Sequence, residues 1–406
     1  MLYQRATRTL RTLDVLSPYP DVRDRHDTRL IMTERHRYTA AMIPCSSSMN
    51  DHSAIAAIAP RVSVLMTTRN GARFIGDSIG SILAQTRTDF ELIIVDDGST
   101  DETPSLLAGY RDPRLRVLRP DRNLGVADAR NFGLAACRGE YIAALDHDDI
   151  SLPERLAVQV RFLDAHPEVV LAGTEVLLRM QDGRTLPTDH VPGSSPALVH
   201  WMLHVDNPFT WSSVMIRAAA LRRLGIFLRR EAEPADDFDL YHRLSGIGTL
   251  ARLNETLTIY RWHAGNTTYA QSERLFASAC GTLARAYEPW LGAGAAEAAQ
   301  LVVHHLSDRQ PVRDIATLGR LGDVLERLLG RFQDIYAADA AALRQIEAHA
   351  GRVWWRVTRS AIRSGTLLAL FRYAARRGLR SGFGPAWHDV VVSVAVGTLR
   401  AMRVVR

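Results

Sequence analysis

Two groups of acidic residues, fifty residues apart, each follow a short apolar run. The first is Asp96-Asp97-Gly98-Ser99 after Leu92–Val95, and the second is Asp146-His147-Asp148-Asp149 after Tyr141–Leu145. Carboxylates accept hydrogen bonds from ribose hydroxyls and base N–H groups, and they also bind divalent cations. The spacing indicates that one group of acids serves a sugar or base, and the other a metal on phosphates.

The apolar runs predict the elements that position these acids. Short runs rich in branched residues are typical of buried parallel strands, and open α/β sheets bind ligands beyond the carboxyl ends of their strands. Strand-like runs alternate with helix-like periodicity from residue 62 onward, and Ser99 is expected to cap a helix. The expected strands are 62–66, 91–95, 115–118 and 141–145, and the expected helices are 74–85, 126–137 and 153–165. This alternation predicts a parallel, doubly wound sheet with right-handed crossovers.

The chain divides into three parts. Residues 1–59 lack periodicity and are expected to be disordered, with Met49 as an alternative start. Residues 60–270 hold the alternating elements, and residues 271–406 are helical and rich in alanine and arginine. The further strands of the middle part are expected near 169–178, 212–216 and 257–262, and its further helices near 218–224 and 236–244.

The loop after the first strand excludes one class of enzyme. Dinucleotide-binding proteins carry G-x-G-x-x-G at this position, whereas this chain has Thr67-Thr68-Arg69-Asn70-Gly71. A nicotinamide or flavin enzyme is therefore not expected.

The segment from Val62 to about Thr268 resembles a family 2 glycosyltransferase of the GT-A fold. The resemblance rests on several motifs that occur in order. They are the two acidic motifs, Asn123-Leu124-Gly125 with Ala129-Arg130-Asn131-Phe132-Gly133, Asn207-Pro208 with Ser212-Ser213-Val214, Asp236-Asp237-Phe238-Asp239-Leu240 with Arg243-Leu244, and Tyr260-Arg261-Trp262-His263. The resemblance implies an α/β fold, with a Rossmann-like, mostly parallel sheet flanked by helices and followed by an α-helical region.

The resemblance also implies residues that bind a nucleotide-sugar donor. UDP-, GDP- or dTDP-linked sugars are the expected donors, and Mg²⁺ or Mn²⁺ is the expected cofactor, because the departing diphosphate carries charge that a cation neutralises. The expected metal ligands are Asp146, Asp148 and His263. The residues expected to contact the donor are Thr67, Asn70, Asp96, Asp97, Asn123, Arg130, Asp146 and Arg261.

Asp237 is the expected catalytic base. Inverting transfer is a single in-line displacement, so a carboxylate on the acceptor side must take the hydroxyl proton as the new bond forms. By resemblance this is the acid just before the aromatic residue, whereas Asp239 is expected to point away and to be structural.

Several of these residues have a structural alternative. Asp97 can belong to a turn rather than contact the donor, and Asp149 can cap the helix near Pro153. Asp146-His147-Asp148 resembles the family's D-x-D motif, in which the middle residue is more often small, and His147 is expected to point outward. The remaining alternatives are a surface position for Arg130, a satisfied strand-end position for His263, and core positions for Trp211 and Trp262 in place of a sugar-stacking platform.

The charge is concentrated at the C-terminal end. Residues 352–406 contain eleven arginines and one acid, Asp389, beside apolar residues such as Phe371. This composition suits a peripheral contact with anionic lipid and equally a solvated helical bundle, whereas nucleic acid is not expected. No run is long enough to span a bilayer, and three scattered cysteines give no disulfide framework, so a cytoplasmic protein is expected, with peripheral contact at the inner face of the membrane as the open alternative.

The expected function has two alternatives. We expect inverting transfer of a sugar from a nucleotide-diphosphate donor to a hydroxyl of a glycan, lipid-linked or protein acceptor, in cell-surface polysaccharide synthesis. The first alternative is a sugar-nucleotide nucleotidyltransferase, for which residues 67–71 would be a poor phosphate loop. The second is a non-catalytic nucleotide or glycan-binding module.

Overall fold

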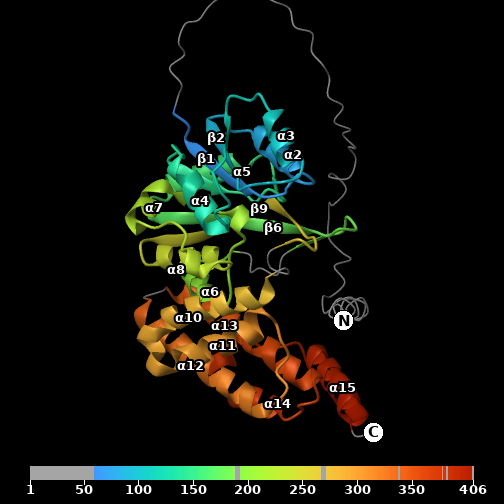
Figure 1. Cartoon of the computed structure of the whole chain (residues 1–406). Coiled ribbons are helices and arrows are strands. Elements are labelled where there is room, and N and C mark those ends of the chain that lie inside the picture. Colours follow the sequence, from blue (N-terminus) through green and yellow to red (C-terminus); the bar gives the residue numbers. More distant parts are fainter. Residues whose placement is uncertain are drawn as a thin grey trace, which may run out of the picture. The chain divides into compact units, whose positions relative to one another are not determined.

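A mixed β-sheet organises the first half of the described chain (Figure 1). The computed structural model describes residues 59–187, 193–266, 271–336, 339–376, 378–380 and 383–404, so the predictions for residues 1–58 and for Met49 lie outside the described residues. The strand order is β3-β2-β1-β4-β8-β6-β9-β5, with β7 paired to β6. The strands are β1 (Val62–Thr68), β2 (Phe90–Asp96), β3 (Leu115–Leu118), β4 (Tyr141–Ala144), β5 (Ile150–Ser151), β6 (Val169–Arg179), β7 (Thr185–Pro187), β8 (Met215–Arg217) and β9 (Thr249–Arg261).

The first four strands form the parallel half of the sheet, as predicted. In register, Val64 of β1 lies beside Leu92 of β2 and Ala143 of β4. Strand side chains alternate between the two faces, so Val64 enters one apolar core while its neighbour Leu65 enters the other. Because the strands run parallel, β2 and β4 bring both acidic motifs to the same edge.

The second half of the sheet departs from the predicted parallel arrangement. Strand β8 runs antiparallel to both β4 and β6, β6 and β9 are parallel, and β5 is antiparallel to β9. The sheet is therefore mixed but mostly parallel and flanked by helices, which is the fold class that the resemblance implies. The last strand, β9, carries the chain back to the acidic edge, where Arg261 ends it.

Helices cover both faces of the sheet. One face packs against α2 (Ile75–Leu83), α3 (Thr103–Ala108) and α5 (Arg155–Ala165). The other face carries α4 (Val126–Ala135), α6 (Pro196–Leu203), α7 (Ala218–Leu224) and α8 (Asp236–Ser245). The expected cap at Ser99 is wrong, because α3 begins at Thr103 and the Ser99 hydroxyl accepts a hydrogen bond from the Asn70 amide instead.

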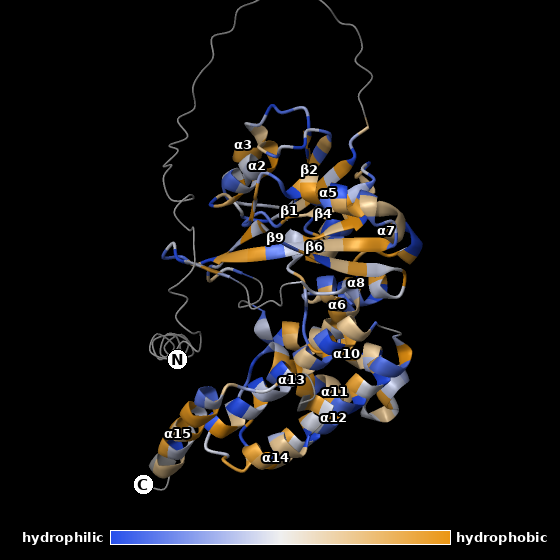
Figure 2. Ribbon diagram, turned by 180° about the vertical axis from the view of Figure 1, so that it is seen from behind, coloured by the Kyte–Doolittle hydropathy of each residue, from blue (hydrophilic) through white to orange (hydrophobic). Residues whose placement is uncertain are grey.

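The C-terminal region is helical, as predicted, and shares its core with the sheet domain. Trp201 of α6 is fully buried; its ring packs edge-on against Phe332 at 5.7 Å, and its Nε1 donates to His349 Nδ1 at 3.1 Å. Figure 2 shows the apolar residues of the strands and of these helices. The helices are α10 (Ser272–Leu291), α11 (Ala295–Val302), α12 (Ile315–Ile335), α13 (Ala340–Arg363), α14 (Ala369–Ala375) and α15 (Trp387–Val404). Among the described helices, none is both long and apolar enough to cross a bilayer.

Candidate active site

The two acids that end β2 have different partners. Asp96 is buried; its Oδ1 accepts from the Ser99 amide at 3.0 Å, and Arg119 lies 3.4 Å from its Oδ2. Asp97 is also buried, and its carboxylate accepts from the amides of Leu124 and Gly125 at 2.7 and 3.0 Å. Asp97 therefore anchors the loop that enters α4.

The other donor-contact residues predicted near β1 and β2 lie around this anchor. Asn123 donates from Nδ2 to Asp97 Oδ2 at 2.8 Å. Thr67 is half-buried near the end of β1. Asn70 is exposed with a left-handed backbone, φ 54°, and its Oδ1 accepts from the Thr100 amide at 2.8 Å. These residues form one edge of the candidate site.

The acids after β4 form a cluster that suits a divalent cation. Asp146, Asp148 and Asp149 each offer a carboxylate oxygen, and these oxygens lie within 4.8 Å of one another. Burial raises the pKa of Asp146, and burial together with the charges of Asp148 and Asp146 raises the pKa of Asp149 well above its usual range. Gathering three buried or half-buried carboxylates is unfavourable unless a positive charge compensates them.

One alternative expected Asp149 to cap the helix near Pro153, and this is wrong. Its Oδ1 accepts from the Arg261 amide at 3.0 Å, whereas its buried Oδ2 has no hydrogen-bond partner within the protein. His147 does not point outward either. Its ring lies against Gly71, so that a Cβ added there would come within 2.6 Å of His147 Cδ2.

The end of β9 reaches the same acids. His263 Nε2 lies 3.0 Å from Asp148 Oδ2, and its ring stacks on Phe74 at 4.6 Å. Arg261 donates to the Asp148 carbonyl and pairs with Asp77 at 2.8 Å. The structure thus brings His263 to the acid cluster, while Arg261 holds the backbone of the loop that carries Asp148.

Arg130 of α4 connects the acid cluster to helix α8. Its Nη2 donates to Asp146 Oδ1 at 2.9 Å, and its Nη1 donates to Asp236 Oδ2 at 3.0 Å. The guanidinium lies over the ring of Trp211, 4.2 Å from the centroid, so this face of the buried Trp211 is covered. Burial acts to lower the pKa of Arg130, but the carboxylates of Asp146 and Asp236 outweigh it and raise that pKa above its usual range.

Asp237 lies at the N-terminal end of α8, next to this ion-pair network. It is half-buried; Oδ1 accepts from the Phe238 amide at 2.7 Å, and Asn207 Nδ2 lies 3.4 Å from Oδ2. Burial and the charge of Asp236 raise the pKa of Asp237 to about 7. A carboxyl group with this pKa can exchange a proton near neutral pH, which is what a general base requires.

Asp239 lies on the other side of α8 from Asp237. It is buried and pairs with Arg243 and Arg285, each at 2.8 Å. The pair with Arg285 joins α8 to α10, and the pair with Arg243 lies within α8. Both contacts are structural, which is the role that the position of Asp239 on the helix predicts.

Sequence reasoning missed the network that joins these groups. The link from Asp146 through Arg130 to Asp236, and the contact of Asn266 Nδ2 with Asp148 Oδ2 at 3.3 Å, were not expected. The contact of Asn207 with Asp237 could have been expected, since Asn207-Pro208 is one of the ordered motifs that carry the family resemblance.

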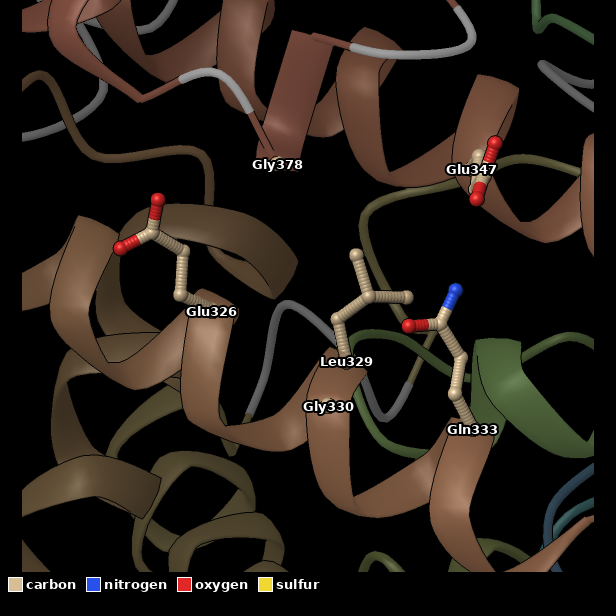
Figure 3. Close-up of a pocket in the computed structure, with 6 residues that line it drawn as sticks. All are labelled: Glu326, Leu329, Gly330, Gln333, Glu347 and Gly378. Carbon is tan, nitrogen blue, oxygen red and sulfur yellow. The ribbon is translucent and has the colours of Figure 1, made fainter.

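A separate pocket lies in the helical region (Figure 3). It has a volume of about 410 Å³ and is lined by Glu326, Leu329, Gly330, Gln333, Glu347 and Gly378. None of these residues belongs to the acid cluster or to α8, and Glu326 is already paired with Arg376. The pocket therefore takes no part in the arrangement described above.

Comparison with known proteins identifies the family. The family model described as Glycosyl transferase family 2 matches residues 63–225, which include both acidic motifs and Arg130. The chain belongs to the family 2 glycosyl transferases. The matched segment ends before α8, so Asp237, Arg261 and His263 lie beyond it.

Curated relatives of this glycosyl transferase agree with the assignment. The chain is 35% identical over 192 residues to a putative glycosyltransferase, EpsE, of Bacillus subtilis, covering 45% of this chain and 66% of that protein. It is 29% identical over 224 residues to an uncharacterized glycosyltransferase of Haemophilus influenzae, covering 52% and 68%. It is 39% identical over 127 residues to the succinoglycan biosynthesis protein ExoO of Rhizobium meliloti, covering 31% and 36%. The chain thus spans about two thirds of the length of the first two relatives and about a third of ExoO.

Proposed function

We propose that this family 2 glycosyl transferase moves a sugar from a nucleotide-diphosphate donor to a hydroxyl group of a glycan, lipid-linked or protein acceptor, with inversion. The observation that carries the proposal is the placement of Asp237, whose pKa is about 7, beside the network that leads through Asp236 and Arg130 to Asp146. A base and a group of donor-binding acids joined in this way suit a single displacement. The name of the relative ExoO supports cell-surface polysaccharide synthesis as the setting.

The acid cluster fits a divalent cation. Asp146, Asp148 and Asp149 supply oxygen ligands, the kind that Mg²⁺ and Mn²⁺ prefer, and the unpartnered Oδ2 of Asp149 leaves acceptor capacity unused within the protein. His263, in contact with Asp148, can supply a nitrogen. We infer that Asp146, Asp148 and Asp149, with His263 beside Asp148, would hold the ion, which when bound supplies positive charge for the departing diphosphate.

The protein's own groups would act as follows. Asp96 accepts hydrogen bonds from the nucleoside, while Asp97 and Asn123 hold the loop beside it. Arg130 keeps Asp146 and α8 in place. Asp237, as the carboxylate, takes the proton of the acceptor hydroxyl while that oxygen attacks the anomeric carbon and the bond to the diphosphate breaks.

A donor screen tests the proposal. The full chain is heated with UDP-, GDP- or dTDP-linked sugars, each with and without Mn²⁺ or Mg²⁺, and the stabilising donor is then assayed for release of its nucleotide diphosphate. We expect one nucleotide class to raise the Tm only when the cation is present. Asp148→Asn should abolish that shift, whereas Asp182→Asn, a matched change in an exposed turn, should keep it.

Two outcomes would contradict the proposal. If no donor raises the Tm with either cation, the acids do not form a nucleotide-sugar site. If a donor binds but no acceptor or water ever releases the nucleotide diphosphate, the chain is a binding module.

A further inference from the structure

The last described helix, α15, exposes several large apolar side chains, while Val390 and Val394 on its inner side pack against the core beside the polar Ser393. Trp387 is 77% exposed, and Val391, Leu399 and Met402 are 56%, 62% and 61% exposed, whereas Ser393 is fully buried. Figure 2 shows apolar residues along this helix. A helix on a protein that meets only water normally has the opposite arrangement.

The contacts between α15 and α13 fix this orientation. Asp389 of α15 accepts from Trp355 Nε1 at 2.7 Å, and Arg363 donates from Nε to the Ser393 hydroxyl at 3.1 Å. Gly397 approaches α13 so closely that a Cβ there would lie 2.1 Å from the Ile362 carbonyl oxygen. Turning the apolar side inward would break these bonds and bring larger side chains against that backbone.

The segment beside α15 exposes further apolar side chains. A Cβ on Gly365 would lie 3.7 Å from Ala401 Cβ, so the turn after α13 packs against the second half of α15. Leu368 and Phe371, which follow this turn, are 63% and 75% exposed. We call these exposed side chains together the outer α15 surface; they are Leu368, Phe371, Trp387, Val391, Leu399 and Met402.

The charge around this surface is positive. Residues 352–406 contain eleven arginines against the single acid Asp389, and Asp389 faces inward, with Arg359 and Arg363 at 3.4 and 3.5 Å. Arg372 of α14 and Arg400 of α15 are exposed. Exposed apolar residues between arginines, with no carboxylate directed outward among the described residues of this segment, match the charge of anionic lipid headgroups.

We propose that the outer α15 surface docks the enzyme on an anionic membrane surface, with α15 lying in the headgroup layer. A second copy of the chain fits this surface less well, because self-pairing would bring arginine against arginine. Nucleic acid would match the arginines but would leave Trp387, Leu399 and Met402 exposed to water. The inference is independent of which sugar is transferred, since it rests on residues far along the chain from the acid cluster.

Vesicle flotation of the full chain tests the proposal. Vesicles of phosphatidylcholine alone are compared with vesicles that also contain phosphatidylglycerol, at low and at high salt. We expect binding to the anionic vesicles only, weakened by salt, with a blue shift of tryptophan fluorescence that Trp387→Phe removes. The double variant Val391→Asp with Leu399→Asp should bind the anionic vesicles at least about tenfold more weakly than the unchanged chain.

A matched double variant provides the control. Ile226→Asp with Ile335→Asp adds the same two charges at residues that are 60% and 57% exposed elsewhere, and it should float like the unchanged chain. Thermal unfolding checks that both double variants are folded. Equal flotation of the two double variants, equal binding to neutral vesicles, or a dimer that the Asp substitutions dissociate without any vesicle binding would each overturn the proposal.

Discussion

At the scale of single residues, the proposed proton transfer depends on Asp237. Its pKa is raised to about 7 by burial and by the charge of Asp236, against the opposing influence of Arg130 and the contact with Asn207. We expect Asp237→Asn to reduce kcat by about 10²–10⁴-fold while donor binding is retained. In the unchanged enzyme, kcat should fall about tenfold per pH unit below pH 7, because the protonated carboxyl cannot accept the acceptor's proton. Full transfer activity in Asp237→Asn would remove Asp237 from the reaction.

The raised pKa of Asp237 also predicts how the free energy of unfolding depends on pH. The carboxyl titrates near 3.8 when the chain is unfolded and near 7 when it is folded, so between these values the folded chain binds more protons. The free energy of unfolding therefore decreases as the pH rises from 4 to 7, because the buried Asp237 carboxyl loses its proton over this range. We expect Asp237→Asn to be more stable than the unchanged chain at pH 8, by about 1–2 kcal/mol, and no more stable at pH 4. Urea unfolding at the two pH values measures both differences, and equal differences would contradict the shift.

The sequence could predict the kinds of residue in this site better than their connections. The acids follow strands whose ends must share an edge, so the proximity of Asp96 to the second motif follows from the alternation of elements. That Asp97 binds the loop before α4, and that Arg130 bridges Asp146 and Asp236, depends on how helices far apart in sequence pack. No local pattern carries that information.

At the scale of secondary-structure elements, Arg130 holds α4, the end of β4 and α8 together. Arg130→Ala would leave the carboxylates of Asp146 and Asp236 without their compensating charge, so we expect a loss of about 3–5 kcal/mol in the free energy of unfolding. Arg130→Lys should lose less, because it keeps the charge but cannot bond to both acids. Arg230→Ala is the control: its side chain is 75% exposed beside Asp128, and the expected change is within about 0.5 kcal/mol. An equal loss in both alanine variants would show that the bridge is not needed.

Two helical glycines separate packing from helix propensity. A Cβ on Gly133 of α4 would lie 2.4 Å from Leu65 Cδ1 and 2.7 Å from Val95 Cγ2, whereas a Cβ on Gly80 of α2 would meet nothing within 4 Å. We expect Gly133→Ala to destabilise the chain by about 1–3 kcal/mol through overpacking against β1 and β2. Gly80→Ala should stabilise it by about 0.5–1 kcal/mol. Thermal unfolding of the two variants measures these opposite shifts, and shifts of the same sign would contradict the packing of α4.

The elements themselves were predictable where periodicity is strong. Strands β1 to β4 and helices α4, α5, α7 and α8 lie within about two residues of the expected ranges. Helix α6 was missed, because residues 198–203 are buried all round and show no amphipathic period. The antiparallel insertion of β8 between β4 and β6 was also missed, since strand order follows from tertiary packing and not from local sequence.

At the scale of the whole molecule, one apolar core extends from the sheet into the C-terminal helices. Trp201 of α6 is fully buried in it, against Phe332 of α12 and His349 of α13. We therefore expect the sheet and the C-terminal helices to unfold together. Trp201→Ala should lower the free energy of global opening by about 3–5 kcal/mol. If the two parts open together, amides in β2 and amides in α13 should show the same decrease in their free energy of opening.

Native-state hydrogen exchange measures this opening at individual amides. Trp387→Ala removes the same side chain from a position that is 77% exposed, and without vesicles it should change protection in either element by no more than about 0.5 kcal/mol. If Trp201→Ala lowered protection in α13 while β2 kept its full value, the helices would open on their own, and the shared core would not couple them to the sheet that carries the acids. Equal loss in both elements would mean that the C-terminal helices support the strand ends that carry the candidate site.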